Sequence, residues 1–324
     1  SMPDTEDNQA AYPQPKTQKY GCGFPVMRIV GLFSLSGGLL LDVATGALKI
    51  GENALFRRLW DTLESGDVLL ADRGFCSYAN YYLLAQRGVD CVMRNHQCRT
   101  VGVREVKQLG KGDRLIHWIK SKPMPKGWDR KQWNAVPEIL LLREITIHIE
   151  EPGFRTEKIV VATTLLDPNQ FSKQAIAELY LKRWRVELYF RDIKITMGMD
   201  ILRCKTPDMV QKELYMHILA YNLVRGLILQ AAKKNGLSPE RISLKGAVAS
   251  VRQWAPMMMG INDAQRLAWL QEGLLNVIAR DLLPLRPNRM EPRAVKRRPK
   301  NYQRLTKPRG QFKECMHRNK YKAP

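Results

Sequence analysis

Four residues that could handle a phosphate and a metal ion are regularly spaced within residues 177–199. They are Tyr180, Arg183, Glu187 and Lys194, and the segment is free of Pro and Gly until its second-last residue. At about 100° per residue, a continuous helix would place the four side chains within roughly 60° of one another. One helical face would then carry a carboxylate flanked by two cations and a phenol. Carboxylates bind divalent ions, while Arg, Lys and Tyr can contact phosphate.

The same spacing also fits an ordinary polar helix. Glu187 stands four residues from both Arg183 and Arg191, and oppositely charged residues at this spacing form ion pairs on solvated faces. From spacing alone, this interpretation outweighs the functional one. A second site element is needed before chemistry can be assigned to the segment.

Asp72 is the second candidate carboxylate. It follows the apolar run at residues 67–71 and precedes Arg73 and a Gly turn. A run of this length predicts a buried strand, and open α/β sheets bind their ligands at the carboxyl ends of strands. Two other uses of Asp72 stay open. It could cap the helix predicted to begin near Ser77, or it could pair with Arg73.

Hydrophobic periodicity predicts the elements that must position these side chains. The amino-terminal part has the order hairpin, helix, strand, helix, strand, which is typical of an α/β fold. The predicted ranges are strands at 27–35 and 39–44, a helix at 52–63, a strand at 67–71, a helix at 78–86 and a strand at 90–93.

Short alternating segments then predict a β-rich insertion between residues 97 and 170, with strands at 139–149 and 158–164. From residue 173 the pattern is helical. Beyond the segment 177–199, helices are expected at 208–234, 243–255 and 264–282.

The charge of the chain predicts an anionic partner. Lys and Arg number 53 against 31 Asp and Glu, which gives a net charge of +22. Nucleic acid is the commonest partner of such a protein. Basic residues recur from Arg286 to Lys322, where four Pro residues exclude an amphipathic membrane helix and favour an arm laid along phosphates.

Other site classes and targeting segments have little support in the sequence. The six Cys residues lack a paired-ligand rhythm, and Cys91, His96 and Cys98 make only a weak zinc signal. No secretory signal opens the chain, and its longest apolar region, 29–41, is too short and broken to span a bilayer.

The two site segments together resemble the DDE-type transposases of the insertion-sequence-four family. The family signature reads Tyr, two residues, Arg, three residues, Glu, six residues, Lys, and Tyr180, Arg183, Glu187 and Lys194 meet it without a gap. Residues 68–78 are similar to its second-Asp motif and place that Asp on Asp72. Residues 12–15, 23–25 and 291–300 also resemble family members, so the likeness runs over nearly the whole chain.

The resemblance implies a ribonuclease-H-like core with a β-rich insertion and a helical carboxyl-terminal part. The expected division is a partial core at 1–96, the insertion at 97–170, the helical completion of the core at 171–283 and a basic irregular tail at 284–324. In such enzymes two Asp and one Glu hold two divalent ions, Mg²⁺ or Mn²⁺, at the scissile phosphate. Asp72 and Glu187 are then catalytic metal ligands.

The implied function is a bacterial DNA transposase that cuts and joins DNA at the terminal inverted repeats of a mobile element. Tyr180, Arg183, Lys194 and Arg73 are expected to contact DNA. The implied partners are double-stranded DNA, as transposon ends and target, and a second subunit on the DNA, with no membrane. The expected location is the cytoplasm, in association with the nucleoid.

The sequence departs from the family at the first catalytic Asp, which belongs on a core strand that has no counterpart here. Asp4, Glu6 and Asp7 lie in a polar segment and are not expected on a strand. Asp42 is predicted to be an exposed sheet residue rather than a substitute for the missing Asp. We therefore expect a piece of a longer transposase with an apolar edge exposed near residues 27–35. Two alternatives remain: an inactive transposase remnant that only binds DNA, and a ribonuclease-H-like nuclease unrelated to transposition.

Overall fold

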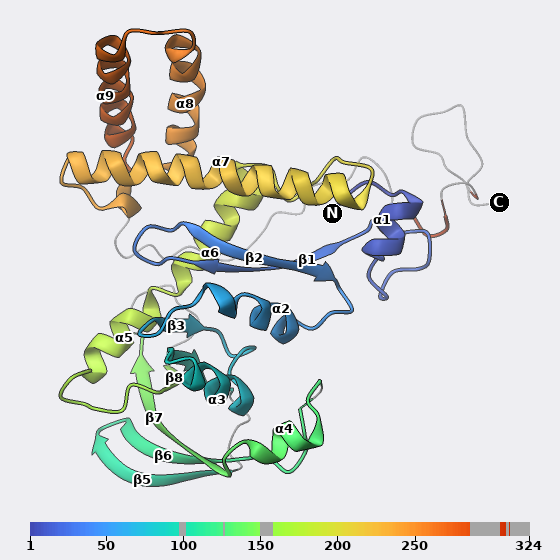
Figure 1. The fold of residues 1–324 in the computed structure, drawn as a ribbon, viewed down its shortest axis with the longest axis vertical. Helices are drawn as coiled ribbons and strands as arrows, with labels where there is room; N and C mark the ends of the chain where they lie inside the picture. Colours follow the sequence, from blue (N-terminus) through green and yellow to red (C-terminus); the bar gives the residue numbers. More distant parts are fainter. Residues whose placement is uncertain (97–101, 126, 150–157, 286–304, 309–310, 312–324) are drawn as a thin grey trace.

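The fold is a mixed α/β arrangement in which a large sheet and a hairpin are followed by a helical part (Figure 1). The computed structural model describes residues 1–96, 102–125, 127–149, 158–285, 305–308 and 311. The mixed α/β class and the helical carboxyl-terminal part predicted from sequence are confirmed. Most of the basic tail predicted at 284–324 lies outside the described residues, as does Cys98.

Six strands form the large sheet, in the order β3-β4-β8-β7-β6-β5. Strands β3 and β4 are parallel, with Val68 opposite Asp90 and Ala71 opposite Met93, and the other neighbours are antiparallel. The strands of the predicted insertion therefore extend the same sheet as the strand before Asp72. The strand bounds are β3 Val68–Ala71, β4 Asp90–Arg94, β5 Val103–Gly110, β6 Asp113–Ile119, β7 Ile139–His148 and β8 Lys158–Thr163.

Helices cover both faces of this sheet. On one face, α3 (Tyr78–Gln86) packs its buried Tyr81 and Leu84 into a cluster that also holds Leu69, and the Tyr81 hydroxyl donates to the Ala162 carbonyl at 2.8 Å. The other face packs against α5 (Lys173–Leu181). The core thus lies in two layers around the strands. A further short helix, α4 (Arg130–Ala135), connects β6 to β7.

The predicted hairpin is a separate two-stranded sheet of β1 (Met27–Phe33) and β2 (Leu40–Ala47). It lies between the long helix α7 (Pro207–Lys234) and α2 (Glu52–Arg58) (Figure 1). Helix α2 is shorter than the helix predicted at 52–63, because a 3₁₀ turn, η1 (Trp60–Thr62), replaces its last turn.

Side chains of α7 hold the turn of the hairpin. The Tyr221 hydroxyl donates to the Gly38 carbonyl at 2.6 Å, and the Arg225 guanidinium donates to the Gly37 carbonyl at 2.7 and 3.1 Å. Gly38 has a φ of 69°, which favours Gly, and an added Cβ would meet the Arg225 side chain. The turn therefore depends on Gly both for its backbone and for the close approach of α7.

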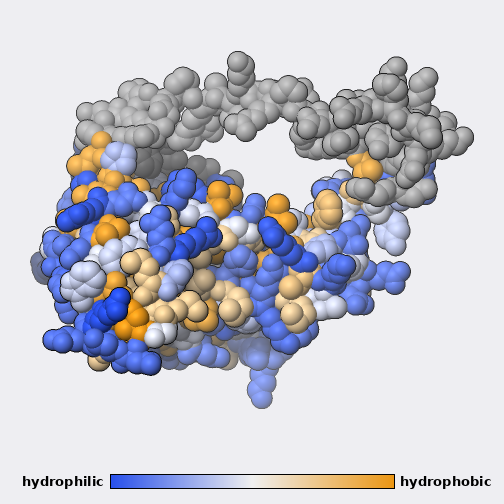
Figure 2. All heavy atoms as spheres, turned by 90° about the horizontal axis from the view of Figure 1, so that it is seen from above, coloured by the Kyte–Doolittle hydropathy of each residue, from blue (hydrophilic) through white to orange (hydrophobic). Residues whose placement is uncertain are grey.

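The remaining helices stand on α7. Helices α8 (Leu244–Met258) and α9 (Ala264–Arg280) form an antiparallel pair that rises from its carboxyl-terminal half (Figure 1). Seen from above relative to Figure 1, the surface is mostly hydrophilic with apolar residues scattered through it (Figure 2). At the other end of α7, the short helix α1 (Glu6–Ala11) packs against it. None of the helices in the described ranges combines the length and apolar content of a membrane span.

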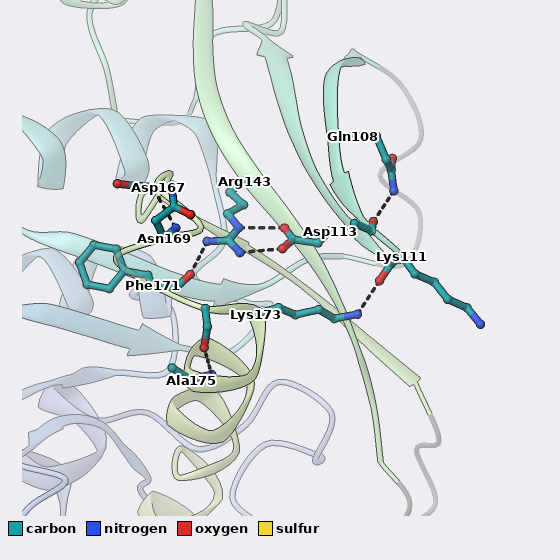
Figure 3. Close-up of polar contacts among 11 residues, drawn as sticks. Gln108, Lys111, Asp113, Arg143, Asp167, Asn169, Phe171, Lys173 and Ala175 are labelled. Carbon is teal, nitrogen blue, oxygen red and sulfur yellow. Dashed lines mark hydrogen bonds and ion pairs between the residues drawn. The ribbon is translucent and has the colours of Figure 1, made fainter.

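A buried ion pair connects the large sheet to the segment that leads into α5. Arg143 on β7 donates to both carboxylate oxygens of Asp113 on β6, at 2.8 and 2.6 Å, and to the Phe171 carbonyl at 2.6 Å. Lys173, the first residue of α5, donates to the Lys111 carbonyl at 2.7 Å (Figure 3). These contacts fix where α5 begins relative to the sheet.

Candidate active site at the carboxyl end of strand β3

Asp72 lies where the sequence predicts it, directly after a buried strand. It follows Ala71 at the end of β3, and its backbone carbonyl accepts from the Phe75 amide at 3.0 Å in the turn that leads to α3. The capping alternative is wrong, because the Ser77 side chain caps α3 by accepting from the Asn80 amide. The half-buried Asp72 shows no ion pair with Arg73 in the described part of the chain, where Arg73 is exposed.

One oxygen of Asp72 has no hydrogen-bond partner. Oδ1 is buried, and no donor approaches it among the residues that the structure describes. A buried acceptor without a donor costs free energy comparable to that of a lost hydrogen bond, so such an atom calls for a partner, such as a water molecule or a bound ion. Asp72 thus presents a free carboxylate oxygen beside the end of β3.

Tyr180 reaches the carboxyl end of β3 from the face of the large sheet that α5 covers. Its side chain on α5 is buried, and its hydroxyl donates to the Ala71 carbonyl at 3.3 Å. Burial raises the pKa of Tyr180 well above its ordinary value, although the positive charge of Arg183 opposes the shift. Tyr180 therefore remains a neutral phenol that ties α5 to the strand carrying Asp72.

Arg183 is the central cation of the arrangement. Its side chain is 13% exposed, its guanidinium lies 5.9 Å from the centre of the Tyr180 ring, and it donates to Glu187 Oε1 at 3.2 Å. Its Nε is buried without an acceptor in the described structure. Arg183 thus contacts both Tyr180 and Glu187 and keeps one donor free.

Glu187 takes part in the ion pair that the alternative interpretation predicts. Its carboxylate is paired with Arg183, while Arg191 instead approaches Asp192 at 4.0 Å. The Glu187 side chain is 66% exposed, so solvent screens this pair. The structure brings Tyr180 and Arg183 to Asp72 and connects Glu187 to them through Arg183.

The continuous helix predicted at 177–199 is wrong. Helix α5 ends at Leu181, and α6 (Trp184–Arg191) begins after a tighter turn in which the Arg183 amide donates to the Tyr180 carbonyl three residues back. A π-helical turn, η2 (Asp192–Thr196), then follows α6. Both irregularities rotate later residues relative to earlier ones, because the number of residues per turn changes. The four signature residues therefore do not share one regular helical face.

Lys194 belongs to a different element from the other signature residues. It belongs to η2, is exposed, and places its ammonium 5.3 Å from the centre of the Phe190 ring. No ion pair between Lys194 and Asp72 or Glu187 occurs among the described residues. Lys194 and Arg73 are thus exposed cations on the two chain segments that carry the carboxylates.

Arg94 is a site residue that the sequence analysis missed. It ends β4, one residue beyond Met93, which pairs with Ala71, so it lies beside Asp72 at the carboxyl ends of two parallel strands. Its charge lowers the pKa of the Tyr180 phenol, although the net shift remains upward because burial dominates. Knowledge that these two strands run parallel would have identified Arg94.

The chemistry of Asp72 suits contact with a divalent metal ion. Carboxylate oxygens are the ligands that Mg²⁺ prefers, and the unpartnered Oδ1 of Asp72 fits this requirement. No group of three or more His, Cys, Asp or Glu residues placed to hold a metal occurs within the described ranges, and this includes Cys91 and His96. Asp72 therefore has a carboxylate oxygen available to an ion, whereas the Glu187 carboxylate is paired with Arg183.

Comparisons with known proteins relate the chain to transposases. The transposase DDE domain family model matches residues 3–223. The chain is similar to the transposase InsG for insertion sequence element IS4 of Escherichia coli (strain K12), with 30% identity over 310 residues, or 93% of this chain and 66% of that protein. It is also similar to the probable transposase for insertion sequence element IS5377 of Geobacillus stearothermophilus, with 35% identity over 72 residues, or 22% of this chain and 19% of that protein.

The extent of these matches decides what they establish. The chain spans 66% of the length of the IS4 transposase, which leaves part of that protein without a counterpart here. The family model, in contrast, covers more than half of this chain, including Asp72, Tyr180 and Glu187. The chain therefore belongs to the DDE transposase family, and its similarity to InsG relates it to the IS4 type.

Proposed function

We propose that the chain carries out DNA transposition chemistry: metal-dependent cutting and joining of DNA at the terminal inverted repeats of a mobile element. The observation that supports this most directly is the unpartnered oxygen of Asp72 beside the cation Arg183. The same proposal includes a ribonuclease-H-like core and the division into segments that is expected from the sequence. The relatives named transposase lend it further support.

Asp72 and Glu187 are the residues that we propose hold divalent ions, Mg²⁺ or Mn²⁺, two in the complete site. Ions held there would activate an attacking water or DNA 3′-hydroxyl and would stabilise the leaving oxygen. In the structure the Glu187 carboxylate accepts a hydrogen bond from the Arg183 guanidinium at 3.2 Å. We therefore expect Glu187 to exchange this ion pair for the metal when DNA is bound, which frees Arg183 for the phosphate.

The cations around Asp72 are proposed to contact DNA phosphates. Negative charge develops on the phosphoryl oxygens during transfer, so fixed positive charge nearby favours the transition state. Arg183 can bind two phosphate oxygens at once, while Lys194 and Arg73 act as more distant charges. The Tyr180 hydroxyl already donates a hydrogen bond to the Ala71 carbonyl. Contact between Tyr180 and a phosphate therefore requires this hydrogen bond to break.

The decisive experiment is Glu187→Gln in a nicking assay on a plasmid that carries two element ends, with Mg²⁺ present. We expect strand cleavage to fall to background while binding to the ends is retained, because the amide preserves the shape of the side chain but loses the charge of a metal ligand. Unchanged cleavage by this variant would contradict the assignment.

Glu178→Gln is the matched control for that experiment. Glu178 is an exposed carboxylate on α5 whose side chain accepts from Gln174 rather than from a site residue. Its substitution changes the net charge by the same amount on the neighbouring helix. Cleavage should therefore match that of the unmodified protein, and an equal loss in both variants would mean that charge alone controls activity.

A second candidate function is a DNA-binding remnant without catalysis. The Glu187–Arg183 ion pair and the absence of a three-carboxylate cluster in the described part of the chain favour it. Binding to element ends without metal-dependent nicking by the unmodified protein would select this function.

A nuclease unrelated to transposition would instead be indicated if Arg183→Ala and Lys194→Ala left cleavage and end binding unchanged. Association of two subunits on DNA is proposed from the family alone.

A further inference from the structure

The backbone of the turn that follows Asp72 is bonded both from within and from outside. Within the turn, the Phe75 amide donates to the Asp72 carbonyl at 3.0 Å. From outside, the Asn53 side chain on α2 donates to the Gly74 carbonyl at 2.9 Å. The Asn80 side chain on α3 donates to the Phe75 carbonyl at 2.7 Å. Two asparagine side chains therefore anchor this turn to the neighbouring helices.

Asn80 is fully buried, and its amide group makes every hydrogen bond that is open to it. Its side chain is 0% exposed. Its nitrogen donates to Asn53 Oδ1 at 2.8 Å as well as to the Phe75 carbonyl, which uses both amide hydrogens. Its oxygen accepts from Nε and Nη2 of Arg57, at 3.1 and 3.0 Å. Burial of an amide without such partners would destabilise the fold.

Arg57 decides which way the Asn80 amide faces. A guanidinium only donates, so the amide oxygen must face Arg57 and the amide nitrogen must face the turn. The guanidinium is itself placed by two indole rings, because its central carbon lies 5.9 Å from the centre of the Trp60 ring and 5.7 Å from that of the Trp128 ring. The donors of Asn80 are therefore held on the turn.

Packing alone does not account for this polar cluster. The surroundings are apolar, since Phe56 of α2 and Ala79 of α3 belong to the same hydrophobic cluster. A leucine in place of Asn80 would pack there without desolvating a polar group. A buried polar network that is fully bonded specifies one arrangement of the groups that it joins. Here the network ends on the backbone that follows Asp72, so the arrangement that it specifies is that of the turn.

We propose that Asn80 is a positioning residue for Asp72, which together with Asn53 and Arg57 holds the turn so that the free Oδ1 of Asp72 faces a divalent ion. The proposal rests on the proposed function, in which Asp72 is a metal ligand. A ligand must be held within about 0.5 Å of its productive position. Changes to the groups that orient metal ligands typically weaken metal binding by about 10- to 100-fold.

The test measures binding of Mn²⁺ alone to the full chain, without DNA, by NMR. Bound Mn²⁺ broadens the amide signals around it, so the loss of the signals of residues 73–75 during a titration gives the apparent Kd at Asp72. Asp72→Asn should remove this broadening. Asn80→Asp should raise the apparent Kd by at least about tenfold. The Phe75 amide should also exchange its hydrogen faster in Asn80→Asp, because the turn is less firmly held.

The Asn80→Asp substitution removes donors and little else. The carboxylate has the shape of the amide and can still accept from Arg57, but it cannot donate to the Phe75 carbonyl. Its negative charge would by itself attract a nearby cation. Weaker binding of Mn²⁺ therefore reports the lost hydrogen bonds and not the added charge.

Asn53→Asp repeats the test at a position where the fold tolerates change more readily. Asn53 is half-buried, and its substitution keeps the acceptor for Asn80 but removes the donor to the Gly74 carbonyl. We expect the apparent Kd for Mn²⁺ to rise several-fold. If Asn80→Asp fails to fold, this variant decides the test.

Asn8→Asp is the matched control for a buried asparagine. Asn8 on α1 is also 0% exposed, and its side chain donates to the carbonyls of Pro3 and Cys204, at 3.1 and 3.3 Å. This substitution should lower the melting temperature but leave the apparent Kd for Mn²⁺ unchanged. An equal loss of Mn²⁺ affinity in this control would overturn the proposal, because lost stability alone would then weaken the site.

The remaining outcomes separate the positioning role from the proposed function. If Mn²⁺ binding depends on Asp72 but is unchanged in Asn80→Asp and Asn53→Asp, the positioning role is wrong and the metal ligand stands. Weaker binding without faster exchange of the Phe75 amide would also contradict it, because the effect would not pass through the turn. If the unmodified chain shows no broadening, or Asp72→Asn keeps it, Asp72 is not a ligand and both proposals are wrong.

Discussion

At the scale of single residues, Arg183 connects the parts of the candidate site. It contacts the ring of Tyr180 and the carboxylate of Glu187, and it lines the same groove as Asp72. Tyr180 in turn is bonded to the backbone that precedes Asp72. A change at Arg183 therefore affects both carboxylates, which makes single substitutions there harder to interpret than substitutions at Glu187.

Arg94 offers a cleaner test of phosphate contact. Arg94→Ala should weaken DNA binding and reduce the slope of log Kd against log salt concentration by about 1, because one phosphate contact is lost. Fluorescence anisotropy over a series of salt concentrations measures both quantities. Arg104→Ala is the control, since Arg104 is exposed on β5 at the opposite edge of the sheet. An equal slope for the two variants would exclude a specific role of Arg94.

The sequence predicted the place of Asp72 but missed Arg94, and the reason is physical. The apolar run before Asp72 is a local pattern that indicates a buried strand by itself. The position of Arg94 depends on the parallel pairing of β3 with β4, which connects residues more than 20 positions apart. Local periodicity contains no information on that pairing.

At the scale of elements, the joint between α5 and α6 decides where the signature residues point. Lys182 and Arg183 have right-handed helical backbone angles, so the joint changes the hydrogen-bond pattern and not the general course of the chain. No Pro or Gly marks this change. The sequence thus predicts helix correctly for most of the segment but cannot predict the break or the π-helical turn η2.

The buried ion pair at the start of α5 should contribute strongly to stability. Arg143→Met leaves Asp113 buried without its partner, which is expected to lower the free energy of unfolding by about 3–5 kcal/mol. Urea denaturation followed by circular dichroism measures the loss. The side chains of Arg143 and Asp113 are 0% and 7% exposed, so little solvent screening reduces the effect.

Lys212→Met is the control for this prediction. Lys212 pairs with Asp208 at 2.7 Å on the surface of α7, where both side chains are well exposed. Its loss should change the free energy of unfolding by less than about 1 kcal/mol. If Arg143→Met were equally mild, the connection between the sheet and α5 would not depend on the ion pair.

At the scale of the whole molecule, the net charge of +22 predicts strong salt dependence of DNA binding. If 6–10 phosphates are contacted, raising salt from 50 to 200 mM should weaken binding to duplex DNA by about 10³–10⁵-fold. Filter binding to a duplex without element ends measures this non-specific component. A change of less than about tenfold would show that the excess positive charge lies away from the DNA.

The hairpin's attachment to α7 has a mechanical consequence for the candidate site. Strand β3, which leads to Asp72, is fixed to the large sheet by a ladder of backbone hydrogen bonds, while the hairpin is held at its turn by Tyr221 and Arg225 of α7. Within the described residues, no strand pairing connects the hairpin to the large sheet. A shift of α7 would therefore carry the turn of the hairpin with it, and the packing of Val30 and Leu32 against the cluster that contains Leu69 would have to adjust.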